Sequence, residues 1–201
     1  MVSYKTKRIL PVILVIVIVI VAVVALVSLA RAVFFNDSPS NSAETIDVSQ
    51  QALLNTAADR SVRMTVRGPI VAEENFKSYR ISISPDARSL TTYVGYLDSV
   101  VDQTVLGNNS AAYTELVYAL DRANMSKGKA FEGEADDTRG ICATGRVYEF
   151  DIINGGNIVK HLWTSTCSGS KGSLDANKDQ LGQLFVNQIP DAGNTIRRIN
   201  L

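Results

Sequence analysis

An uninterrupted apolar run near the N-terminus constrains this chain more than any other feature. Of the 22 residues from Ile9 to Ala30, 20 are Ala, Val, Ile or Leu, and none is charged. As a helix the run would be about 33 Å long, which matches a bilayer hydrocarbon core about 30 Å thick. A lone strand would leave its backbone groups unpaired in lipid. We therefore expect residues 9–31 to form a transmembrane anchor helix that contacts membrane lipid through residues 9–30.

Basic residues beside the apolar run indicate its orientation. Lys5, Lys7 and Arg8 precede the run without any acidic residue among them. Arg31 is the only basic residue close behind it. Because Lys and Arg next to a span are retained in the cytoplasm, we expect residues 1–8 to be a cytoplasmic flank. The chain would then be a single-pass protein of the cell membrane, with its C-terminal part outside the cytoplasm.

A cleaved signal peptide is the alternative interpretation of the run. Ala30-Arg31-Ala32 has the small-x-small form that signal peptidases accept. Cleavable apolar regions hold about 7 to 15 residues, however, and this run is longer. We therefore favour a retained signal-anchor, and mature protein that begins at Val33 would contradict it.

The remainder of the chain has the composition of a tethered globular domain. Residues 36–46 are rich in Ser and Asn, so we assign residues 32–46 to a polar linker. Residues 47–201 are long enough to form one extracytoplasmic domain with its own core. The formal net charge of the whole chain is zero, which excludes a strongly basic nucleic-acid binder.

Hydrophobic periodicity predicts an α+β fold for this domain. Apolar residues at every second position predict strands, and apolar residues three and four apart predict helices. We expect a mostly antiparallel sheet with helices packed on one face. The expected elements are a helix over 47–60, three strands between 61 and 97, a helix over 110–125, a polar loop over 127–140, a hairpin over 141–167, a helix over 175–188 and an edge strand over 195–201.

The two cysteines of the chain both fall in the predicted hairpin. Outside the cytoplasm, such thiols tend to be oxidised in pairs. A four-residue loop over 153–156 would place Cys142 directly opposite Cys167, close enough for a disulfide. A two-residue loop, Gly155-Gly156, would not. We therefore expect the longer loop and a Cys142–Cys167 disulfide.

The same register defines a candidate binding face. It would place Tyr148 opposite His161 and Arg146 opposite Trp163, so that a cation faces an indole ring. His161 is the only histidine in the chain. Beside two aromatic residues on a half-buried strand, it is better explained as a packed residue than as a catalyst.

One short motif suggests a reactive serine. Residues 168–171 match S-x-x-K, in which one helical turn brings a Lys amine beside a Ser hydroxyl in penicillin-recognising enzymes. The segment is rich in Gly and Ser, and no S-D-N or K-T-G sequence accompanies it. Ser168 and Lys171 are therefore low-ranked catalytic candidates, and a flexible connector is the favoured interpretation.

An incomplete calcium-loop pattern follows. Asp175, Asn177 and Asp179 occupy the first ligand positions, but Gln180 stands where Gly is needed and Val186 where a closing Glu is needed. Capping of a helix explains the acidic residues better. We expect no metal and no cofactor.

These observations favour a non-enzymatic function. We expect a binding or envelope-assembly module whose partner is an envelope protein or a cell-wall ligand, with no nucleic acid involved. The alternative is a membrane-anchored hydrolase or transferase that uses Ser168 and Lys171, with residues 127–140 as a lid.

Overall fold

The computed structural model describes residues 48–201. The predicted cytoplasmic flank, anchor helix and polar linker (residues 1–8, 9–31 and 32–46) lie outside these residues. Between residues 48 and 201, no helix is both long enough and apolar enough to span a bilayer.

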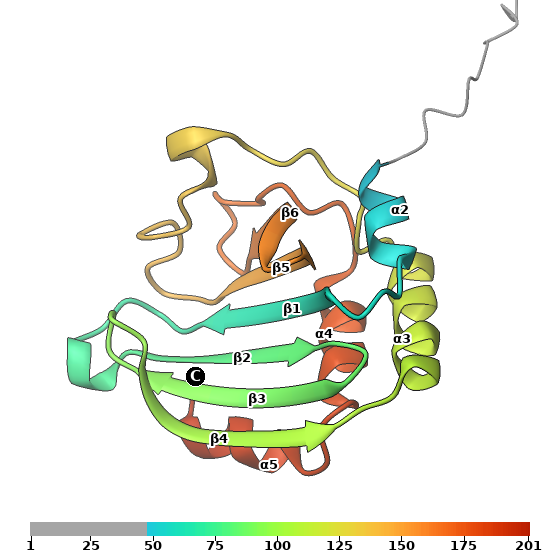
Figure 1. The fold of residues 1–201 in the computed structure, drawn as a ribbon. Coiled ribbons are helices and arrows are strands. Elements are labelled where there is room, and N and C mark those ends of the chain that lie inside the picture. Colours follow the sequence, from blue (N-terminus) through green and yellow to red (C-terminus); the bar gives the residue numbers. More distant parts are fainter. Residues whose placement is uncertain (1–47) are drawn as a thin grey trace, which may run out of the picture. The chain divides into compact units, whose positions relative to one another are not determined.

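Strands with apolar residues at alternate positions build a six-stranded sheet in the order β4-β3-β2-β1-β5-β6 (Figure 1). Every neighbouring pair is antiparallel, which confirms the predicted α+β class and antiparallel sheet. The strands are β1 (Arg60–Arg67), β2 (Lys77–Ile83), β3 (Ala87–Val94), β4 (Ser99–Gly107), β5 (Val147–Asn154) and β6 (Asn157–Ser165).

Four α-helices in the described part of the chain pack on one core with the sheet. Each contributes at least one buried apolar side chain to this core, which also contains Met64 of β1 and Phe150 of β5. The rings of Phe150 and Phe185 lie 6.1 Å apart. The helices are α2 (Val48–Leu54), α3 (Ser110–Arg122), α4 (Lys178–Val186) and α5 (Ala192–Ile199), and the short 3-10 turns are η1 (Glu73–Asn75) and η2 (Gly133–Asp136).

Three elements differ from the sequence prediction. The first helix ends at Leu54 rather than near residue 60, because Arg60 already begins β1. The C-terminal segment forms helix α5 rather than an edge strand, since Ala192 and Ile199 recur at helical spacing and are both buried. Strand β4 was not predicted, because none of its residues is buried and its sequence shows no clear alternation.

The β5–β6 turn consists of Gly155 and Gly156, so the predicted four-residue loop is wrong. Their φ angles of 55° and 81° suit a tight two-residue hairpin turn. An extra residue on β6, Val159, then shifts the register so that Asp151, not Tyr148, lies opposite His161. Because successive strand residues point to opposite faces, this change alters which side chains share a face.

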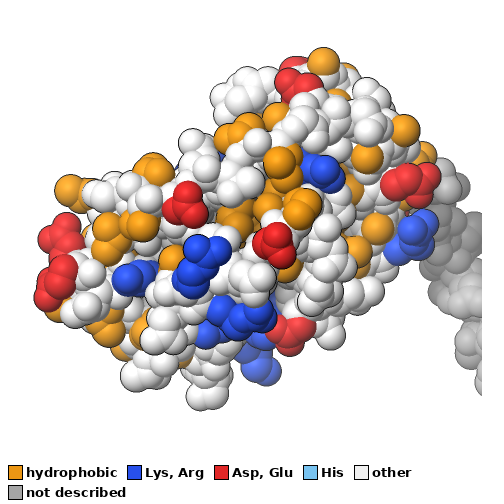
Figure 2. All heavy atoms as spheres, turned by 90° about the horizontal axis from the view of Figure 1, so that it is seen from below, with side chains coloured by type: hydrophobic (Ala, Val, Ile, Leu, Met, Phe, Trp, Pro, Cys, Tyr) orange, Lys and Arg blue, Asp and Glu red, His pale blue; other side chains and the backbone are white. Residues whose placement is uncertain are grey.

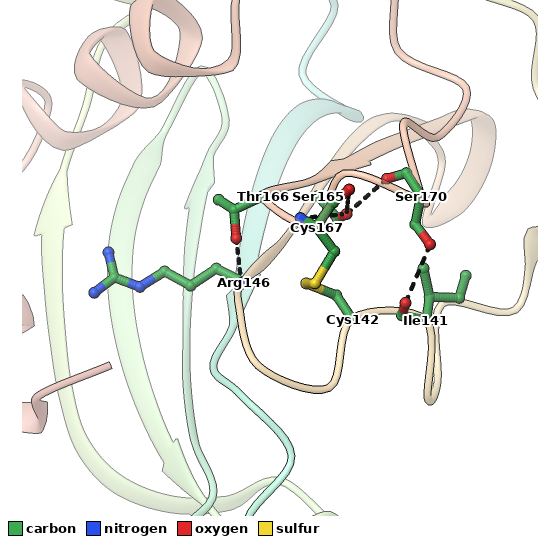
Figure 3. The surroundings of a disulfide bond; sticks show 7 residues. All are labelled: Ile141, Cys142, Arg146, Ser165, Thr166, Cys167 and Ser170. Carbon is green, nitrogen blue, oxygen red and sulfur yellow. Dashed lines mark hydrogen bonds between the residues drawn. A yellow bond between two sulfur atoms is a disulfide. The ribbon is translucent and has the colours of Figure 1, made fainter.

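The predicted disulfide between Cys142 and Cys167 is nevertheless confirmed (Figure 3). The sulfur atoms are 2.08 Å apart and the Cα atoms 5.6 Å apart. Cys142 precedes β5 and Cys167 follows β6, so the bond joins two loops rather than two paired strand residues. The Ser170 hydroxyl donates a hydrogen bond to the Ile141 carbonyl at 3.1 Å and holds the same loops together.

Candidate functional site

The sheet face opposite the helices carries charged side chains. On β1, Val62, Met64 and Val66 are buried in the helix-side core. Alternation therefore directs Arg63 and Arg67 to the other side of the sheet. We call this side the polar face; its main residues are Arg63, Arg67, Arg80, Glu149, Asp151 and His161.

Asp151 is the centre of the first charged cluster on the polar face. Its Oδ1 lies 2.6 Å from Nδ1 of His161, and its Oδ2 accepts a 2.7 Å hydrogen bond from Nε of Arg63. The three residues lie directly opposite one another on β6, β5 and β1. The Asp151 side chain is only 4% exposed, whereas that of His161 is 21% exposed.

His161 and Asp151 stabilise each other's charged forms. The hydrogen bond that His161 donates to Asp151 raises the pKa of His161, although burial of the ring acts in the opposite direction. Burial alone would raise the pKa of Asp151, but the hydrogen bond from His161 and the charge of Arg63 outweigh it, so that this pKa is lowered. Both shifts favour the imidazolium–carboxylate ion pair.

Arg67 is the centre of the second cluster. Its Nε donates to Glu149 and its Nη1 donates to Asp98, both at 3.2 Å. Thr138 donates a 2.6 Å hydrogen bond to the same Glu149 oxygen, which attaches the polar loop over 127–140 to the sheet. Burial lowers the pKa of Arg67, but the charges of Glu149 and Asp98 raise it more. Two carboxylates thus neutralise this guanidinium.

A largely apolar pocket of about 360 Å³ opens beside Arg67. Pockets that hold small ligands begin at about this volume. The rings of Phe76 and Tyr96 stack in its wall with centroids 4.3 Å apart. The Tyr96 hydroxyl donates a 2.5 Å hydrogen bond to the Val71 carbonyl, which fixes the ring. We call it the Tyr96 pocket; its principal lining residues are Arg67, Ile70, Phe76, Tyr96, Cys142 and Val147.

Exposed apolar side chains border the Tyr96 pocket. Ile70 and Tyr96 line it and are 45% and 46% exposed, respectively. Leu97, the next residue along the turn between β3 and β4, is 86% exposed. Apolar side chains grouped in this way around a hollow are typical of a binding surface.

The four residues of the predicted binding face do not share one face. His161 lies on the polar face, and Trp163 is two residues further along β6 on the same side. Tyr148 packs against the helix-side core instead. Arg146 precedes β5, and its guanidinium donates to the carbonyl of Leu201. The changed hairpin register separates the four side chains.

Ser168 and Lys171 lie in an exposed loop after β6. The Ser170 N–H donates to the Cys167 carbonyl at 3.1 Å and closes a turn. Because the segment is not helical, it does not form the helical turn that an S-x-x-K motif uses to bring amine and hydroxyl together.

The incomplete calcium-loop pattern forms the start of α4. The side chain of Asn177 accepts hydrogen bonds from the backbone of Asp179 and Gln180 at 2.9 and 3.1 Å. It therefore serves as a helix cap. Among residues 48–201, no group of three or more His, Cys, Asp and Glu side chains could hold a metal ion.

Sequence reasoning missed both charged clusters and the Tyr96 pocket. The sequence did contain a signal for the clusters. Arg63 and Arg67 on β1 have the opposite charge to Glu149 and Asp151 on β5, with which they pair. The pocket left no such signal, since its walls come from four separate segments of the chain.

No protein-family model matches this sequence, and a search of curated proteins also finds no match. Function is therefore inferred from the Tyr96 pocket and the charged groups beside it.

Proposed function

We propose that this chain is a single-pass, membrane-anchored binding module that presents its α+β domain outside the cytoplasm. The apolar run over 9–30 and the basic residues before it support the anchor and its orientation. The Cys142–Cys167 disulfide supports an oxidising compartment, since such bonds are rare in the cytosol.

The Tyr96 pocket is the binding site of this module, and its ligand is an apolar or aromatic side chain of another envelope protein. The observation that carries this assignment is the apolar hollow whose lining includes the exposed side chains of Ile70 and Tyr96. Transfer of one large apolar side chain from water into such a hollow contributes about 1.5–3 kcal/mol. This is enough to anchor a larger interface.

The charges beside the pocket argue against an anionic cell-wall ligand. Arg67 is the partly buried cation of the lining, and it already pairs with Asp98 and Glu149. Arg139, at the mouth, pairs with Asp137 at 2.5 Å. An anion would have to compete with these carboxylates, whereas an apolar group leaves every pair intact.

Site-specific photo-crosslinking in intact cells tests this proposal. A benzophenone amino acid would replace either Tyr96 or Tyr118 in the full chain. These tyrosines are 46% and 48% exposed, so their accessibility is matched. Only Tyr96 lines the pocket. We expect a discrete protein adduct from position 96 and none from position 118.

A second pair of variants links the adduct to the pocket. Ile70→Glu places a charge in the pocket lining, whereas Ile158→Glu places the same charge on β6; the two isoleucines are 45% and 51% exposed. Ile70→Glu should abolish the adduct and Ile158→Glu should leave it. Equal adducts from both tyrosine positions, or an adduct that survives Ile70→Glu, would contradict the proposal.

A further inference from the structure

Strand β4 is an edge strand that is accessible along its whole length. The strand order places it at one end of the sheet, and none of its nine residues is buried. Val100, Val101 and Val105 are 62%, 59% and 60% exposed. Figure 2 views the molecule from the side where Figure 1 places β4 and α5, and shows hydrophobic side chains interspersed with both basic and acidic ones.

Backbone groups of β4 are free to pair with another strand. The Asn108 N–H donates to the Asp86 carbonyl at 2.8 Å, which extends the β3–β4 pairing beyond Gly107. In an antiparallel ladder, the residues that bond to one neighbour alternate with those that face away. The register of the β3–β4 pairing shifts between Thr92 and Tyr93, which leaves Val101 as an extra residue on β4. From Asp102 to Asn108 the even-numbered residues therefore bond to β3, and the N–H and C=O groups of Gln103 and Val105 point outward.

The opposite edge of the sheet, which β6 forms, is partly covered by another segment of the chain. There the N–H groups of Ser173 and Leu174 donate to the Trp163 carbonyl at 2.9 and 3.0 Å. The segment after β6 thus covers part of that edge. Long, uncovered edges with exposed apolar residues favour pairing with another strand. Of the two edges, β4 is the one suited to an intermolecular contact.

We propose that β4 pairs antiparallel with β4 of a second copy of this chain, across a two-fold axis that passes beside Gln103. Gln103 is the middle residue of the nine-residue strand, and it lies in the part of β4 whose pairing with β3 is regular. Its outward-facing backbone groups meet the same groups of the second copy.

Side chains are complementary in the same register. Val101 lies opposite Val105 of the second copy, and Asp102 lies opposite Thr104. Apolar residues thus meet each other and no like charges are opposed, which favours pairing. This self-complementarity favours a second copy over an unrelated strand.

Cysteine crosslinking of the full chain in its native membrane tests the register. Gln103→Cys places two thiols directly opposite each other across the axis. Gly107→Cys is the matched control, because it is also an exposed β4 position. Its two copies would be separated along the strand by eight residues, or about 27 Å. We expect a disulfide-linked dimer from Gln103→Cys and a monomer from Gly107→Cys on non-reducing gels.

A second comparison tests the edge itself. Val105 on β4 and Val159 on β6 are 60% and 44% exposed. In the Gln103→Cys background, Val105→Lys should abolish the dimer and Val159→Lys should preserve it. The proposal is overturned by equal crosslinking at positions 103 and 107, by a dimer that survives Val105→Lys, or by a monomeric Gln103→Cys chain. A crosslink from position 103 to a different protein would also overturn it.

Discussion

Loss of the Cys142–Cys167 disulfide should destabilise the domain by about 3 to 4 kcal/mol. The two cysteines are 25 residues apart in sequence. Release of a closed loop of that length raises the entropy of the unfolded chain by an amount equivalent to about 3.5 kcal/mol at 25 °C. Cys142 is buried in a small cluster with Val147 and Trp163, so replacement by alanine also removes some packing.

Urea unfolding of the Cys142→Ala/Cys167→Ala variant measures this loss. Trp163 is the only tryptophan of the chain. It is 4% exposed and belongs to the same cluster, so its fluorescence reports unfolding where the bond is lost. With a urea slope of about 2 kcal/mol/M for a domain of this size, the midpoint should fall by about 1.5–2 M.

Two controls separate the crosslink from its surroundings. Ser168→Ala, at an exposed position in the same loop, should leave the midpoint unchanged. Wild-type protein reduced with a thiol reagent should unfold near the midpoint of the double variant. A loss below about 1 kcal/mol in the double variant would refute the loop-closure reasoning. A reduced wild type as stable as the oxidised protein would refute it too.

Three further outcomes can be measured. The hydrogen bond to Asp151 raises the pKa of His161. The stabilisation that this bond gives the folded state is therefore complete below about pH 6.5 and is lost as the pH rises through the folded-state pKa of His161. His161→Gln should remove this decline from the free energy of unfolding between pH 6 and 9, and an unchanged pH profile in the variant would contradict the prediction. Gly172 has a φ of 78°, and a methyl group there would overlap the Trp163 carbonyl. Gly172→Ala should therefore cost more than about 1–2 kcal/mol in urea unfolding, whereas Gly169→Ala, which meets no atom within 4 Å, should cost less than about 0.5 kcal/mol. Protease added to intact cells should digest the domain, and its protection would contradict the proposed orientation.

Local patterns predicted the elements whose partners are near in sequence. Asn109 caps α3 by accepting a 2.9 Å hydrogen bond from the Ala112 N–H, as its position before an apolar helical stripe predicts. Strands β1 and β2 each direct alternate apolar residues into the core, so their sequences alternate clearly. Strand β4 has water on both faces. No burial constrains its sequence to alternate, and the pattern that identifies a strand is absent.

The hairpin shows why register was harder to predict than strands. The cysteines fit a four-residue loop if both lie in paired strands. The chain instead bends before β5, so Cys142 reaches Cys167 from a loop. Two adjacent glycines already favoured a two-residue turn, but the extra residue Val159 on β6 leaves no local signal. A bulge is stabilised by contacts on both sides of it, which a single strand does not reveal.

The chemistry of the Tyr96 pocket follows from contacts of still longer range. Arg67 and Glu149 are 82 residues apart in sequence, and Arg67 and Asp98 are 31 apart. In the sequence, each of these charged residues suggests a surface that attracts an ion of opposite sign. Once folded, the guanidinium has two carboxylate partners, and the remaining surface beside it belongs to Phe76, Tyr96 and Val147. A group that enters this space gains by leaving water rather than by meeting a charge, which is why we expect an apolar side chain there.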